Sequence, residues 1–166
     1  KEIYTDQINT PDQKKFKRLF NYYLKYDSRN KILDHFFTKY FDEESVFKKL
    51  YMTKDNIIEM FNAGHVIGSH THNHKVMSRL SKEDQEYQIE KSENILASFL
   101  GKTWKDNLTF CYPYGGFNSF NQDTKSVLIK RGYDMSFMVG NVKINDDNVR
   151  YHHELKRIDC NRFLKV

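Results

Sequence analysis

The sequence has few cysteines and no long apolar run. Its only cysteines are Cys111 and Cys160, which excludes a disulfide framework and a thiolate metal cage. No apolar stretch reaches membrane-spanning length, and the opening KEIYTDQINT has no hydrophobic leader core. Neither a Cys-x-x-Cys finger nor an aromatic sheet signature is present, so we expect no nucleic-acid partner. We leave the location open between the cytoplasm and the cell envelope.

The composition is that of a folded domain with a basic surface. The chain has 166 residues, 39% hydrophobic and 15% aromatic, which is enough for one core and too short for two. The net charge is +5, but the lysines are dispersed rather than gathered in a patch. We therefore interpret the positive charge as a solvated surface.

Glycine is absent from the first third of the chain, and the local composition changes near Tyr51. Residues 1–50 are predicted to be a helical insertion or layer, and residues 51–166 the motif-bearing α/β part of one domain. Thr10, Ser28, Asp42, Thr53 and Ser81 are the expected helix caps. Helices alternate with strand candidates at 65–69, 108–112, 133–139 and 157–160, which predicts an α/β fold with parallel strands. In such folds the loops at the carboxyl ends of the strands build the site.

Three histidines occur within five positions of Gly68-Ser-His-Thr-His-Asn-His74. Imidazole is a common zinc ligand, so this cluster indicates a metal site. His70 and His72 share a side in a strand, whereas His70 and His74 share a side in a helical turn. Thr71 and Asn73 suit a turn, which favours the second pair. Zinc sites usually need a third protein ligand, and neither Asp134 nor Asp159 is marked out by its spacing.

A second distinctive segment, FCYPYGG at residues 110–116, lies at the end of another strand candidate. The histidine segment and this later segment resemble two motifs of NodB-type polysaccharide deacetylases, carbohydrate esterase family 4. Residues 64–74, GHVIGSHTHNH, resemble the motif in which His-Thr/Ser-x-x-His follows a strand. Residues 110–116, FCYPYGG, resemble the family's Arg-x-Pro-Tyr/Phe-Gly motif. Residues 77–81, MSRLS, resemble the approach to the next helix. The resemblance covers about residues 51–139, and the opening helices match no part of the family pattern.

The resemblance implies a distorted (β/α) barrel, here incomplete at its N-terminus and carrying an added helical segment. It implies a divalent metal, usually zinc, with His70 and His74 as two of its ligands. Tyr114 would give its backbone N–H to the oxyanion as the catalytic contribution of this turn. Tyr112, Pro113 and Gly115 would line the sugar groove. The implied reaction is removal of acetyl groups from N-acetylated sugars of a polysaccharide or surface glycan by metal-activated water.

The chain departs from the family pattern in three places. No Thr-Phe-Asp-Asp strand precedes the histidines, Cys111 replaces the arginine of the later motif, and no clear Leu-x-His follows. His152 and His153 are the nearest candidates for the general acid. We interpret the first departure as truncation, in which a fuller polypeptide supplies the aspartates. The alternative is a catalytically inactive deacetylase-like module that binds carbohydrate through Tyr112, Tyr114 and Phe117.

A second enzyme class, the amidohydrolase or PHP-type metal hydrolases, uses His-x-His on a strand. It would bind its metal through His70 and His72. Such enzymes need further histidine ligands downstream, and no histidine occurs between Lys75 and Arg150. This absence favours the deacetylase interpretation.

Overall fold

Two compact units make up the chain, one spanning Asn9–His65 and the other running from Val66 onwards. The computed structural model describes residues 8–140 and 150–158. The predicted strand end at Asp159 and Cys160 lies outside these residues. Within them, no helix is long and apolar enough to cross a membrane.

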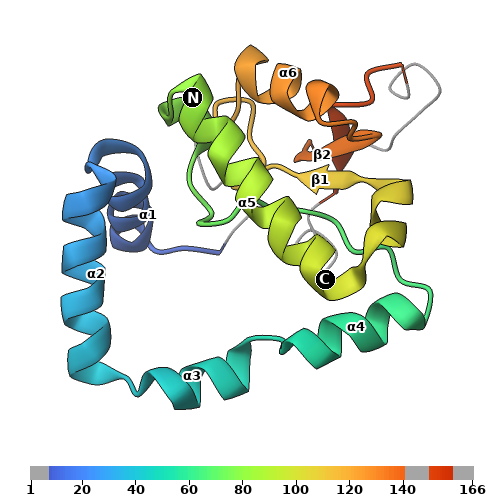
Figure 1. Ribbon diagram of the computed structural model, residues 1–166. Helices are drawn as coiled ribbons and strands as arrows, with labels where there is room; N and C mark the ends of the chain where they lie inside the picture. The colour runs from blue at the N-terminus through green and yellow to red at the C-terminus, as the bar shows by residue number, and fades with distance from the viewer. Residues whose placement is uncertain (1–7, 141–149, 159–166) are drawn as a thin grey trace. The chain divides into compact units, whose positions relative to one another are not determined.

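The first unit is entirely helical (Figure 1). Its elements are α1 (Pro11–Arg18), a π-helical turn (Leu19–Tyr23), α2 (Tyr26–Tyr40), α3 (Glu43–Leu50) and α4 (Lys54–Asn62). Capping boxes at Thr10 and Thr53 start α1 and α4, and the Asp42 side chain caps α3, as predicted. Helix α1 ends at Arg18, where the π-helical turn begins. The cap predicted at Ser28 is wrong, because α2 begins at Tyr26.

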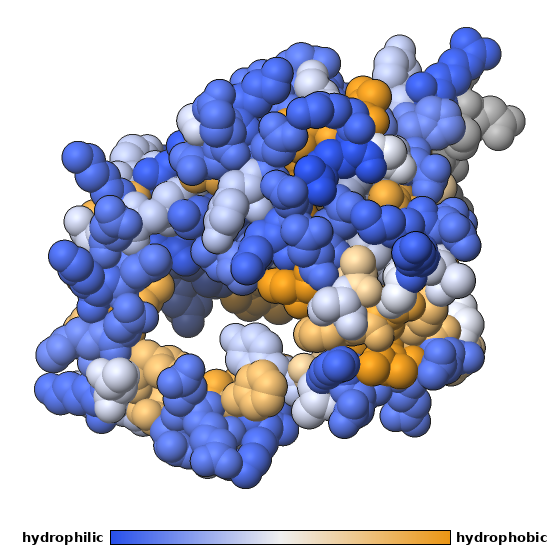
Figure 2. All heavy atoms as spheres, viewed as in Figure 1, coloured by the Kyte–Doolittle hydropathy of each residue, from blue (hydrophilic) through white to orange (hydrophobic). Residues whose placement is uncertain are grey.

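No residue of α1 to α4 is buried, although these helices are rich in aromatic side chains. Phe16 stacks on Phe20 with ring centres 4.1 Å apart, and Phe37 stacks on Phe41 at 5.4 Å. Such pairs, one helical turn apart, stabilise a helix locally. Hydrophobic surface is visible over α3 and α4 in the lower part of Figure 2. The helical unit is therefore held by local contacts rather than by a core of its own.

The second unit is a mixed helix-and-sheet structure around a small parallel sheet in the order β1-β2-β3. Its elements are a 3-10 turn (Met77–Arg79), α5 (Lys82–Leu100), a 3-10 segment (Lys102–Asn107), β1 (Thr109–Cys111), α6 (Gln122–Lys130), β2 (Met135–Val139) and β3 (Leu155–Arg157). Helix α6 is the crossover that makes β1 and β2 parallel (Figure 1). The α/β class predicted from the alternation is confirmed in this form; a closed barrel is not shown.

The core of this unit lies between the sheet and the helices α5 and α6. Phe110 and Met138 on the strands are buried, as are Ile89 on α5 and Leu128 on α6. The predicted cap at Ser81 begins α5, and Gly101, with a φ of 75°, ends it. The sheet and helices thus form a fixed base for the loops that leave the strands.

A buried carboxylate joins three elements of this unit. Glu93 on α5 accepts from Lys105 at 2.7 Å and from Arg131 at 2.8 Å, and only 5% of its side chain is exposed. Burial of the carboxyl opposes ionisation, but the hydrogen bonds and charges of Lys105 and Arg131 outweigh it, so the pKa of Glu93 lies below its ordinary value. The ionised carboxylate therefore stabilises the folded state.

We expect Glu93→Gln to lower the free energy of unfolding by about 3 kcal/mol, because it leaves two cations facing a neutral group. The folded-state pKa lies below the unfolded value. The stabilisation is therefore complete above the unfolded pKa and is lost as the pH falls through the folded one. Urea unfolding of both proteins across this acidic range measures it. Glu44→Gln, which removes the exposed pair with Lys48, is the control expected to change nothing measurable. Equal stability of the Glu93 and Glu44 variants would refute the argument.

Candidate functional site

The histidine segment leaves the sheet beside β1. Ser69 forms a parallel bridge with Phe110; its N–H donates to the Thr109 carbonyl at 2.8 Å, and its carbonyl accepts from the Cys111 N–H at 2.9 Å. A Cβ on Gly68 would lie 2.7 Å from the Thr109 Oγ1, so glycine permits this approach. The strand predicted over 65–69 is reduced to this one bridge. It still places His70 at the carboxyl end of the neighbouring strand.

The loop from His70 to His74 is not the helical turn that the sequence favoured. Thr71 and His74 both have left-handed backbones, with φ of 65° and 49°. The His74 N–H donates to the Thr71 Oγ1 at 3.1 Å, which closes a side-chain turn in place of a helical hydrogen bond. The loop therefore brings its ends together by a different route from the one predicted.

The rings of His70 and His74 nevertheless lie close together. Their centres are 4.8 Å apart and their planes are inclined by 71°. Two imidazoles that bind one tetrahedral ion at about 2.0–2.1 Å hold their ring centres roughly 5 Å apart. The spacing of this pair therefore fits a shared cation. The assignment of both residues as ligands stays a prediction.

One nitrogen of the His70 ring already forms a hydrogen bond. Nδ1 lies 2.6 Å from the Cys111 carbonyl oxygen, which can only accept, so Nδ1 carries the proton and Nε2 carries the lone pair. Desolvation by the surrounding protein lowers the pKa of His70. The bond to Cys111 opposes this shift, and the charge of Arg157 adds to it. The lowered pKa favours the neutral imidazole, and the bond to Cys111 orients the ring, as a metal ligand requires.

The Pro-Tyr-Gly-Gly turn follows β1 and lies against the same histidines. The Tyr114 ring packs edge-on against His74, with centres 4.8 Å apart. Tyr114 and Gly115 are both left-handed, with φ of 64° and 66°, and the Gly115 carbonyl accepts from the Val139 N–H at 2.9 Å. The turn is thus fixed to the end of β2. Tyr114 is the residue of this turn whose side chain lies beside the histidines and is partly exposed.

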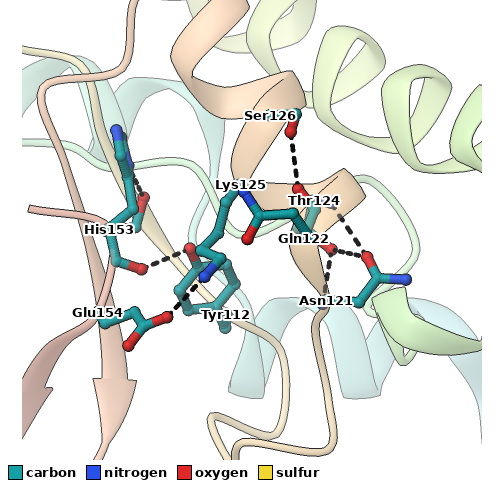
Figure 3. Close-up of polar contacts among 9 residues, drawn as sticks. Tyr112, Asn121, Gln122, Thr124, Lys125, Ser126, His153 and Glu154 are labelled. Atoms are coloured by element: carbon teal, nitrogen blue, oxygen red, sulfur yellow. Dashed lines mark hydrogen bonds and ion pairs between the residues drawn. The ribbon is translucent and has the colours of Figure 1, made fainter. Parts of the chain in front are cut away.

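Tyr112 and Pro113, predicted to contact the sugar, are both buried. The Tyr112 ring stacks on Phe120 with centres 3.8 Å apart, and its hydroxyl donates to the His153 carbonyl at 2.7 Å (Figure 3). Burial raises the pKa of this hydroxyl far above its usual range. The Tyr112 and Pro113 side chains therefore pack beneath the turn, and contact of these two residues with a sugar stays a prediction.

His152 and His153 precede β3 and lie at the amino ends of the strands. The His153 Nδ1 is 3.0 Å from the Ser136 Oγ, and the Lys125 ammonium lies 2.7 Å from the Glu154 carboxylate nearby (Figure 3). Both histidines line a cavity of about 540 Å³ together with Lys125 and Glu154. Three strand spacings of about 4.8 Å, or roughly 14 Å, separate the chain at Ser69 from β3. The structure therefore does not bring the two predicted general-acid candidates to His70.

A third metal ligand is not found among residues 8–140 and 150–158, where no three His, Cys, Asp or Glu side chains are grouped to hold an ion. Asp134 lines the same cavity as His152, away from His70. Asp159 lies outside the described residues. The described part of the chain thus supplies two imidazoles and leaves the remaining ligands open.

The fold and the site together define a small mixed α/β domain with a histidine pair and a Gly-rich turn at the carboxyl edge of a parallel sheet. A family model described as polysaccharide deacetylase matches residues 23–136. The chain belongs to the polysaccharide deacetylase family. The match contains both histidines and Tyr114, and it begins nearer the N-terminus than the motifs predicted, so the helices from Tyr23 onwards fall within it. No curated protein and no solved structure matches the chain.

Proposed function

We propose that this chain removes acetyl groups from N-acetylated sugars of a polysaccharide or surface glycan, with a divalent cation held by His70 and His74. The observation that carries the proposal is the oriented histidine pair. The rings lie 4.8 Å apart, and the Nδ1 of His70 is fixed on the Cys111 carbonyl. Membership of the polysaccharide deacetylase family supports a carbohydrate amide as substrate. We expect zinc as the ion, and the small sheet to be part of the family's distorted barrel.

In this proposal the chain's own groups bind and orient the cation and the sugar substrate. The Nε2 of His70 is the atom that would hold the cation, because Nδ1 is bonded to the Cys111 carbonyl. The Tyr114 backbone N–H stabilises charge on the acetamide oxygen, while the turn ending at Gly115 borders the sugar. A bound divalent cation would supply Lewis acidity and lower the pKa of water. The ring of Tyr114 keeps the His74 imidazole in place.

Acetate release from an N-acetylglucosamine oligomer tests the proposed reaction. We expect release by the protein supplied with zinc, abolition by EDTA, and recovery when zinc is added back, because the cation is required for the hydrolytic step. Titration of zinc by calorimetry on the same sample measures binding separately. Stoichiometric zinc without acetate release would favour an inactive deacetylase-like module. Glycan binding that persists in EDTA would favour a carbohydrate-binding module.

A further inference from the structure

A buried glutamine on α5 contacts the backbone of the histidine loop. Gln88 is only 2% exposed. Its side-chain Oε1 accepts from the Asn73 N–H at 2.9 Å, and its main-chain carbonyl accepts from the His72 N–H at 3.1 Å. These two successive N–H groups belong to the residues between the two histidines of the pair. One residue of the helix therefore holds the middle of the loop.

The loop needs such support because its backbone is unfavourable. A left-handed conformation at a residue other than glycine costs about 1–2 kcal/mol, and the loop has two, at Thr71 and His74. His72 and Asn73 are both exposed, so their side chains add little packing to the loop. The bonds to Gln88 and the bond from His70 to Cys111 attach the loop to the rigid helix and sheet. Without the Oε1 acceptor, the Asn73 N–H loses its contact with α5.

We propose that Gln88 is the positioning residue of the histidine pair. It touches neither the cation nor the substrate, but holds the backbone that brings the His74 ring to the His70 ring. An amide suits this role because it offers an acceptor inside the protein without the cost of burying a charge. The part of the inference that concerns the cation rests on the proposed function. The part that concerns the loop does not.

Gln85 is a matched control on the same helix. It is fully buried, like Gln88, but its partners lie elsewhere: its Nε2 donates to the Leu80 carbonyl at 3.2 Å, and its Oε1 accepts from the Thr124 hydroxyl at 2.5 Å. Replacing either glutamine by methionine removes an amide at similar volume. Only the Gln88 change removes a bond to the histidine loop.

The experiment compares Gln88→Met, Gln88→Glu and Gln85→Met in the full chain. The first readout is amide hydrogen exchange at Asn73 in the metal-free protein, and the second is zinc affinity by competition with a chromophoric chelator. In Gln88→Met we expect the Asn73 amide hydrogen to exchange about 10-fold faster than in the wild type. We expect this variant to bind zinc about 10- to 100-fold more weakly. Gln88→Glu keeps the acceptor and should restore both values, although the buried carboxyl lowers the melting temperature. Gln85→Met should lower the melting temperature and leave both readouts unchanged.

Each outcome decides the inference. Unchanged Asn73 exchange in Gln88→Met, or an equal change in Gln85→Met, overturns it. Faster exchange in a chain whose wild type binds no zinc supports the anchoring of the loop and contradicts the proposed function instead. If Gln88→Met does not fold, Gln88→Asn, which shortens the side chain by one carbon, is measured in the same way. Wild-type exchange in that variant would overturn the inference.

Discussion

His74→Ala is expected to lower the zinc affinity of the chain by about 100- to 1000-fold while leaving the fold intact. Structural zinc sites bind with about 10–16 kcal/mol shared over four ligands, so one ligand contributes roughly 3 kcal/mol. The His74 side chain is exposed, and its ring contacts His70 and Tyr114 at the surface rather than in the core. Its loss therefore removes a ligand without opening a cavity. Chelator competition gives the affinity, and circular dichroism gives the fold.

His72→Ala is the matched control for this prediction. It removes an imidazole from the same loop, but the backbone bond from the His72 N–H to the Gln88 carbonyl stays. We expect zinc affinity close to that of the wild type. Dependence on His72 with indifference to His74 would point to the His-x-His pairing of amidohydrolase or PHP-type enzymes. A His74→Ala chain that melts in circular dichroism would instead show that His74 supports the fold.

Features set by neighbouring residues were predictable from the sequence. Thr10, Thr53 and Ser81 start helices because each side chain accepts from an N–H three residues further on. Gly101 and Gly132 adopt the positive φ that ends a helix, 75° and 79°. The parallel sheet could be inferred because helices and strands alternate. All of these depend on short spacings that are visible in one sequence.

Features set by distant partners were not predictable in the same way. The strand expected before the histidines shrinks to a bridge because its pairing depends on Phe110, about forty positions away. The loop that contains the left-handed Thr71 is bonded to Gln88 through the N–H groups of His72 and Asn73, and Gln88 lies 15 positions beyond Asn73 in the sequence. A weak signal did exist, since Gln85, Gln88 and Ser92 recur at helical spacing with Ile89 on the buried face of α5. Polar residues on a buried helix face need partners, and for Gln88 the partner proved to be the site loop.

The register of the sheet decides which aromatic side chains of the turn are buried and which are exposed. Tyr112 follows the last residue of β1, and its N–H donates to the Phe137 carbonyl, which keeps it in the sheet with its ring in the core. Tyr114 lies two residues further on, beyond the strand, and its ring reaches His74. Aromatic residues beside a Gly-rich turn look equivalent in a sequence. The pairing with β2 decides which of them is available to a ligand.

Gly115→Ala is expected to lower the free energy of unfolding by about 3 kcal/mol, combining the left-handed penalty with overpacking. At its φ of 66°, a Cβ would lie 2.5 Å from the Val139 Cγ2 and 3.0 Å from the Val139 N. The turn must move to relieve this overlap, and the Tyr114 N–H moves with it. Because the loss of one oxyanion donor costs about 100- to 1000-fold, acetate release should fall by at least about 100-fold at saturating zinc.

Gly116→Ala separates this effect from a general intolerance of the turn. A Cβ added at Gly116 would meet no heavy atom within 4 Å, and its φ is not positive, so stability and acetate release should stay near the wild type. Adding Val139→Ala to Gly115→Ala removes the Cγ2 overlap but leaves the backbone nitrogen, so the double variant should recover stability only in part. Full activity in Gly115→Ala would show that the chemistry does not use the Tyr114 backbone. Equal damage from Gly116→Ala would mean that the turn is sensitive for a reason other than the approach of Gly115 to β2.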